Sequence, residues 1–226
     1  MKSLRLFYTA LALALPALGQ AGGEALVQGQ CASCHALEAP AESADIGERT
    51  ERQAPPLYYA GNKYREQWLV EWLQQPRRLH PAGYYPPEHV QAGEGGDQVQ
   101  ADTLVDHPAL SAEEAGQAAE YLMTLRDHDE LIEQDGYEPG SVALRMGMMD
   151  FRKFKGCDAC HRDAEDNGGL SGPELYTAWQ RLQPAYISSY IANPVAWDRH
   201  SMMPAQDYNE TAVHKLVHYL KAIGEE

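Results

Sequence analysis

The sequence has few basic residues, few phenylalanines and few apolar runs. Its 18 Lys and Arg stand against 33 Asp and Glu, which gives a formal charge of −15. Such a surface argues against nucleic acid and anionic lipid as partners. It favours a partner protein with a basic docking face, and the alternative is that the charge serves solubility alone. Only 3 Phe accompany 13 Tyr and 4 Trp. We therefore expect cores built mainly from aromatic rings that carry a polar edge.

One apolar stretch stands out, at the N-terminus. Basic residues occur within positions 1–5, positions 6–18 are mostly apolar, and small residues follow at Gly19 and Ala21. This layout is typical of a secretory signal peptide over residues 1–21, cleaved near Ala21, and a retained membrane anchor is the alternative. No other stretch is long and apolar enough to cross a bilayer. We expect a periplasmic protein with no membrane span after cleavage.

The sequence contains only four cysteines, and all four belong to two copies of one motif. Cys-x-x-Cys-His occurs at Cys31, Cys34 and His35, and again at Cys157, Cys160 and His161. This is the signature of c-type haem attachment, in which two thiols bind the haem vinyl groups and the imidazole binds iron. A disulfide framework has no use for the two histidines, and a zinc site would need one grouping of four ligands. A thioredoxin-like motif has no use for a duplicated His either.

The sequence that follows each motif is also repeated. The 19-residue spacing from Leu57 to Pro76 recurs from Leu175 to Pro194. Within this window Trp68 and Trp72 correspond to Tyr186 and Tyr190, an i, i+4 aromatic pair on one face of an expected helix. A repeat on this scale indicates two copies of one small unit.

Helix signals flank these windows. Residues 142–155 form an amphipathic run before the second motif. Ser111 to Glu114 has the form of a capping box that opens a helix through Leu125, and Asn209 opens a counterpart to about Ile223. No strand pattern is found. Residues 127–140 are rich in Asp, Glu and Gly and are expected to be a linker.

With these motifs, each half resembles a class I cytochrome c domain, and the whole resembles a tandem dihaem member of that family. The resemblance implies an all-α protein of two domains. With the signal peptide at 1–21 and the linker at 127–140, the first domain covers 22–126 and the second covers 141–226. It also implies two covalently bound haem c groups. Pro55 and Pro173 would present carbonyl groups to Nδ1–H of His35 and His161, which fixes the tautomer of each imidazole.

In this family a Met-Pro loop supplies the second iron ligand, and the C-terminal half has such a loop. Met203 directly precedes Pro204 and is the expected ligand of the second haem, with Met202 as the alternative. A thioether ligand raises the reduction potential of haem. We therefore expect the second site to be the high-potential one.

The N-terminal half departs from the pattern, because Tyr85-Pro86 stands where Met-Pro is expected. His89 is the first choice for the iron ligand, because it can reach back from just after these residues. His107 is an alternative, because His107 directly precedes Pro108, as Met precedes Pro in the family's loop, and lies four residues before the Ser111 cap. Tyr85 as a phenolate, His80, and an open iron site are further readings. With a His ligand, the first haem should have the lower potential.

Electron transfer is the function that the resemblance implies. A carrier between a donor dehydrogenase or quinol-oxidising complex and a terminal oxidase or reductase needs only two stable haems. No acid–base pair or nucleophile with a recognisable catalytic spacing is present. The alternative is a haem enzyme, or a subunit of one, whose open or His-ligated first haem acts on a small inorganic substrate.

Overall fold

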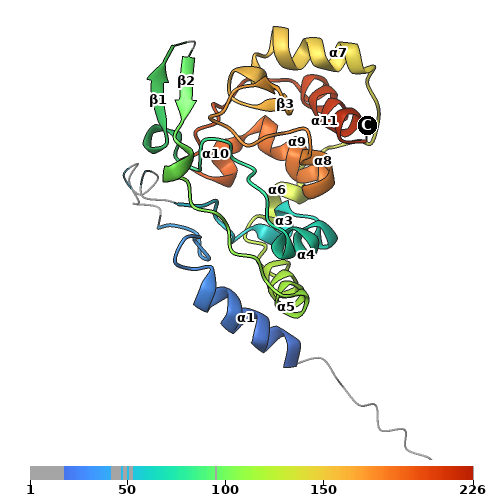
Figure 1. Cartoon of the computed structure of the whole chain (residues 1–226). Coiled ribbons are helices and arrows are strands. Elements are labelled where there is room, and N and C mark those ends of the chain that lie inside the picture. Colours follow the sequence, from blue (N-terminus) through green and yellow to red (C-terminus); the bar gives the residue numbers. More distant parts are fainter. Residues whose placement is uncertain (1–17, 42–46, 48–49, 51–52, 95, 226) are drawn as a thin grey trace, which may run out of the picture.

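The computed structural model describes residues 18–41, 47, 50, 53–94 and 96–225 (Figure 1). The α-helices are α1 (Leu18–Gln30), α3 (Ala60–Lys63), α4 (Glu66–Gln74), α5 (Ala112–Leu122), α6 (Asp129–Glu133), α7 (Leu144–Met148), α8 (Ala178–Arg181), α9 (Pro184–Ala192), α10 (Pro194–Trp197) and α11 (Glu210–Gly224). The other helical turns are η1 (Pro86–Glu88), η2 (Ala101–Thr103), the π-helical η3 (Met149–Phe154) and η4 (Cys157–Ala159). The strands are β1 (Val90–Gly93), β2 (Gly96–Val99), β3 (Arg162–Ala164) and β4 (Asn167–Gly168).

The expectation of an all-α protein is wrong. The described part of the chain is 47% helical and 8% strand, and it contains two small antiparallel sheets. β1 pairs with β2 from Val90 opposite Val99 to Gly93 opposite Gly96, and β3 pairs with β4. Strands of two to four residues are too short to display the alternation that identifies a strand in sequence. The chain is therefore not a tandem pair of all-α cytochrome c domains.

The internal repeat is visible as one helix pair in each half. α3 and α4 cover 60–63 and 66–74, and α8 and α9 cover 178–181 and 184–192, with the same two-residue break. α4 ends before Gln75-Pro76, and α9 ends before Asn193-Pro194. The residue before a proline is disfavoured in helical conformation, which explains both ends.

The two helix pairs meet through equivalent residues. Tyr64, between α3 and α4, forms an isolated antiparallel bridge with Leu182, between α8 and α9. The amide of Gln183 donates a 2.9 Å hydrogen bond to the carbonyl of Lys63. On the other side of the bridge, the amide of Arg65 donates an equally long bond to the carbonyl of Arg181. Contact between equivalent positions is the pattern that a local twofold axis produces.

The buried core is continuous across the two halves. Trp197 is almost fully buried, and its ring lies 5.5 Å from Tyr59, 4.7 Å from Tyr186 and 5.3 Å from His128, measured between centroids. Tyr58 donates a hydrogen bond to the Trp197 carbonyl at 3.3 Å. These rings come from both halves, so the two halves share one apolar cluster.

The expected helix starts at Ser111 and Asn209 are present. Ser111 forms a complete capping box with Glu114 at the start of α5. The Asn209 side chain accepts a hydrogen bond from the Ala212 amide at the start of α11. The run over 142–155 is helical as well, but α7 passes into the π-helical turn η3 after Met148.

α1 packs against α5 at very short range. A Cβ atom on Gly23 would lie 2.2 Å from the Gln117 carbonyl oxygen. Only glycine allows the two backbones to approach this closely. In Figure 1, α1 forms one end of the molecule, and α7 and α11 lie toward the opposite end.

Two segments bear on the expected boundaries. Residues 127–140 contain α6, where Asp129 accepts a 2.7 Å hydrogen bond from the Asn62 side chain.

Of the expected signal peptide, residues 1–17 lie outside the described part of the chain, and the remainder belongs to α1. Among the described residues, no helix is both long and apolar enough to span a membrane.

Candidate functional site

The first Cys-x-x-Cys-His motif continues the last turn of α1. The Cys31 amide donates to the Val27 carbonyl at 2.9 Å, and the His35 amide donates to the Cys31 carbonyl at 3.0 Å. The expected hydrogen bond from Nδ1–H of His35 to the Pro55 carbonyl is present at 2.7 Å. Nε2 of His35 is therefore the nitrogen available to a metal.

His107 lies beside His35, with 6.2 Å between the ring centroids and 61° between the ring planes. Nδ1–H of His107 donates to the Pro108 carbonyl at 2.9 Å, so Nε2 is again the available nitrogen. An imidazole nitrogen binds a transition metal at about 2 Å, so two imidazoles on opposite sides of one ion have ring centroids about 6 Å apart. The separation of these two histidines fits that arrangement.

The other ligand candidates of the N-terminal half lie elsewhere. His89 follows η1, and its Nδ1 is hydrogen-bonded to Thr103 at 2.8 Å. Tyr85 is the half-buried N-cap of η1. His80 packs edge-to-face on Tyr84 at 5.4 Å, and both residues line the cavity of the second motif. His107 is the candidate that the structure brings to His35.

The second motif lies on the turn η4. The amide of His161 donates to the Cys157 carbonyl at 3.0 Å, and Nδ1–H of His161 donates to the Pro173 carbonyl at 2.8 Å. Gly172 supports the same ring, because a Cβ atom there would lie 2.5 Å from Cε1 of His161. The tautomer and the position of His161 thus match those of His35.

A cavity of about 380 Å³ opens next to His161. Both Met203 and Met202 line it, although 51% of the Met202 surface is exposed. Most of the exposed lining is apolar, and aromatic rings such as Tyr186 contribute to it. A largely apolar cavity with a few polar groups is typical of a cofactor site.

One buried cation in this cavity lacks a complete set of partners. Arg181 is 3% exposed and lines the cavity, and its Nε has no hydrogen-bond acceptor. Its Nη2 donates to the Glu174 carbonyl, and the Glu174 carboxylate lies 3.8 Å from Nε. A buried guanidinium with a donor to spare fits a ligand that carries a carboxylate. Haem c has two such groups, so His161, Met203 and Arg181 fit that cofactor.

Burial sets the ionisation of the motif residues. It lowers the pKa of His161 and His35, against the opposing effect of the bonds to Pro173 and Pro55. It also raises the pKa of the Cys157 thiol to about 11. Neutral imidazoles are the form that binds iron, whereas redox-catalytic cysteines have lowered pKa values.

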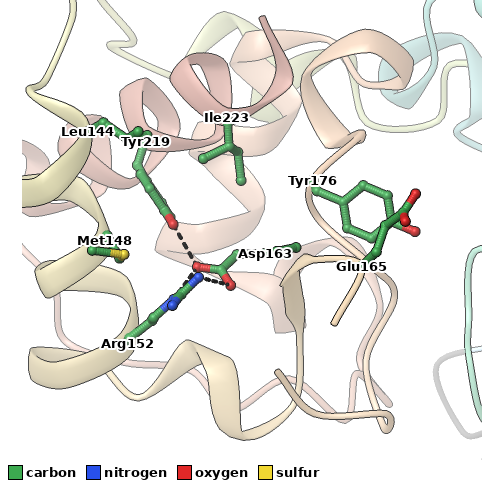
Figure 2. Close-up of a pocket in the computed structure, with 9 residues that line it drawn as sticks. Leu144, Met148, Arg152, Asp163, Glu165, Tyr176, Tyr219 and Ile223 are labelled. Carbon is green, nitrogen blue, oxygen red and sulfur yellow. Dashed lines mark hydrogen bonds and ion pairs between the residues drawn. The ribbon is translucent and has the colours of Figure 1, made fainter. Parts of the chain in front are cut away.

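A second, shallower pocket is formed by α7, η3, β3 and α11 (Figure 2). Its centre is the fully buried carboxylate of Asp163, which accepts bonds from Arg152 Nε at 2.7 Å and Nη2 at 2.9 Å, and from Tyr219 Oη at 2.6 Å. The carboxylate, the guanidinium and the hydroxyl group are thus hydrogen-bonded to one another. The network joins the β3–β4 hairpin to η3 and α11, and its role is therefore structural.

The described residues contain no group of three or more His, Cys, Asp or Glu side chains placed to hold a metal ion. The His35–His107 pair and the His161–Met203 pair are smaller sets. In a c-type haem site the porphyrin supplies four of the iron ligands, and the chain supplies one or two.

Sequence reasoning did not find the residues that the N-terminal half contributes to the second cavity. Pro55, Tyr59, Lys63 and Tyr64 all line it. Arg181 was missed as well. The one available signal is that Lys63 and Arg181 are equivalent positions of the repeat, and both are basic.

In comparisons with known proteins, no family model, curated protein or solved structure matches this chain. The assignment of the sites therefore depends on the motifs and on the geometry described above.

Proposed function

We propose that the chain carries two covalently bound haem c groups and transfers electrons between redox proteins in the periplasm. The observation that carries the proposal is the shared arrangement of the two motifs. In each, the His after the cysteine pair has Nδ1 bonded to a proline carbonyl, and Nε2 is left for iron. Bound haem supplies a one-electron couple, and the chain binds and orients it.

The two sites differ in their second ligand. For the first haem we assign His35 and His107, because their 6.2 Å separation suits two imidazoles on one iron. For the second we assign His161 and Met203, which line one cavity. A bis-imidazole haem has a lower potential than a His/Met haem. Electrons therefore run from the N-terminal to the C-terminal site.

The charge of the chain supports a carrier role. A formal charge of −15 steers encounters with basic docking faces and speeds association at low ionic strength. The donor is a dehydrogenase or a quinol-oxidising complex, and the acceptor is a terminal oxidase or reductase. The signal peptide expected over residues 1–21 supports the periplasm as the compartment of this exchange.

The test uses the full chain expressed with haem-maturation machinery. The haem-to-protein ratio of the denatured protein should be two, and Cys157→Ala with Cys160→Ala should reduce it to one. Low-temperature electron paramagnetic resonance of the oxidised protein should show two low-spin ferric signals, one bis-His and one His/Met in type. A ratio below two contradicts the proposal, and a high-spin first iron favours an enzyme with an open site.

A further inference from the structure

The charged lining of the cavity next to His161 is opposite in sign to the chain as a whole. Three cations line it, which are Lys63, Lys155 and Arg181. Among the described residues, Asp198 is the only Asp or Glu in that lining. The whole chain, by contrast, has a formal charge of −15. An excess of cations around a largely apolar cavity indicates a ligand that carries negative charge.

Two of these cations come from opposite halves of the chain and meet at one junction. Lys63 directly precedes Tyr64, Arg181 directly precedes Leu182, and the antiparallel bridge between the repeats pairs Tyr64 with Leu182. The backbone carbonyls of Lys63 and Arg181 each accept a 2.9 Å hydrogen bond from the opposite half. The backbones of both residues are thus fixed at the same boundary of the cavity.

Both of these cations have donors left for a ligand. Arg181 is 3% exposed, and its Nε has no hydrogen-bond acceptor. Lys63 is half-buried and forms no ion pair with any described Asp or Glu. Its Nζ lies 5.0 Å from the ring centroid of Tyr64, 5.7 Å from Tyr59 and 5.8 Å from Tyr186, and all three rings line the cavity. Cation–π attraction holds the ammonium group there without a hydrogen-bond acceptor for its N–H donors.

The third cation belongs to a different edge of the cavity. Lys155 lies two residues before Cys157, and its Nζ is 4.4 Å from the Tyr208 ring. Cysteines of this motif bind the vinyl groups of haem, and the two propionates extend from the opposite edge of the porphyrin. A haem attached at Cys157 would therefore direct its propionates away from the segment of Lys155. Lys63 and Arg181 are the cations that remain for them.

We propose that Lys63 and Arg181 form a carboxylate-binding subsite across the junction of the two halves, which takes the propionates of the haem attached to the C-terminal half. This inference rests on the proposed function. Arg181 supplies planar guanidinium donors, and Lys63 supplies a compact ammonium group. The N-terminal half thus contributes a residue that binds the second haem, and the C-terminal half by itself lacks one of the two cations.

The test uses the full-length holoprotein, poised between the two midpoint potentials so that only the second haem is reduced. Resonance Raman spectra excited in the ferrous Soret band then report the propionate bending modes of that haem. Lys63→Met should shift the propionate band and lower the second midpoint potential, because a carboxylate without its cation favours ferric iron. Lys63→Arg keeps the charge and the donors, and it should leave both close to wild type.

Lys155→Met is the matched control, because it removes a cation of the same cavity near the cysteines. It should leave the propionate band unchanged, although the lost charge lowers the second potential. An equal shift of the band in Lys63→Met and Lys155→Met would overturn the inference and leave the proposed function intact. So would a Lys63→Met protein with two haems and the wild-type band.

Haem content covers the remaining outcomes. Loss of the second haem in Lys63→Met but not in Lys63→Arg supports the inference, because only the charge distinguishes the result. Loss of the second haem in both variants contradicts it, because arginine retains the charge and the donors. A wild-type chain with fewer than two haems refutes the proposed function, and the inference with it.

Discussion

The imidazole rings of His35 and His107 lie 6.2 Å apart, centroid to centroid, although α3, α4 and the β1–β2 hairpin lie between them along the chain. Each ring donates Nδ1–H to a proline carbonyl, at Pro55 and Pro108. The tautomers and the ring separation are compatible with the proposal that both imidazoles bind one iron through Nε2.

His107→Met should raise the potential of the first haem, because a thioether stabilises ferrous iron relative to an imidazole. His89→Gln is the control and should leave both potentials and both low-spin signals unchanged, since His89 is bonded to Thr103. Potentiometric titration with electron paramagnetic resonance measures both. A loss of the bis-His signal in His89→Gln, with His107→Met unaffected, would reverse the assignment.

Met203→Leu should convert the second iron from low-spin to high-spin and lower its potential, because leucine has no ligand atom. Met202→Leu should retain the low-spin signal, since Met202 is half exposed beside the cavity. The two variants differ by one position and share the same loop. If Met202→Leu alone changes the spin state, Met202 is the ligand.

Gly172→Ala should displace the second proximal imidazole. The added methyl group would lie 2.5 Å from Cε1 of His161, which requires the ring or the loop to move. We expect an altered spectrum of the second haem and a loss of about 1–3 kcal/mol of stability from overpacking. Gly116→Ala on α5, where a Cβ meets no atom within 4 Å, should leave the spectrum unchanged.

Asp163→Asn should destabilise the chain by about 3 kcal/mol, because it breaks a buried charge pair with Arg152. For a protein of this size that corresponds to a fall of roughly 6–12 °C in Tm. Tyr219→Phe removes only one of the bonds to the carboxylate and should cost less. Thermal unfolding followed by circular dichroism compares the two, and equal losses would contradict the network.

The same carboxylate makes stability depend on pH. Burial acts to raise the pKa of Asp163, but hydrogen bonds from Arg152, Tyr219 and Asn167 outweigh it and hold the pKa below its usual value. Such a group stabilises the fold fully above its unfolded pKa of about 3.9, and the contribution is lost as the pH falls through the folded pKa. When the pH is lowered from about 5, the Asp163→Asn variant should therefore lose less of its stability than the wild type does.

Gly23→Ala should weaken the packing of α1 on α5, because the new Cβ would lie 2.2 Å from the Gln117 carbonyl oxygen. We expect a loss of about 1–3 kcal/mol. Gly29→Ala on the same helix meets no atom within 4 Å and should stabilise it by about 0.5–1 kcal/mol through helix propensity. Urea unfolding of both variants measures the difference, and equal effects would mean that α1 is not packed as described.

The sequence by itself determined the features that depend on neighbours along the chain. The Ser111 and Asn209 caps, the ends of α4 and α9 before prolines, and the turn geometry of both Cys-x-x-Cys-His motifs are local hydrogen-bond patterns. The bonds from His35 and His161 to Pro55 and Pro173 were implied by the resemblance of each half to a class I cytochrome c domain, and both are present.

Only the tertiary structure decided which loop residue reaches His35. His89 and His107 stand on the same long connection, and the path of that connection depends on the β1–β2 hairpin, whose short exposed strands carry no periodic signal. The contact between the two halves was likewise not predictable, because the junction of Tyr64 with Leu182 joins residues far apart in sequence. Such contacts arise from the packing of apolar faces, which composition does not specify residue by residue.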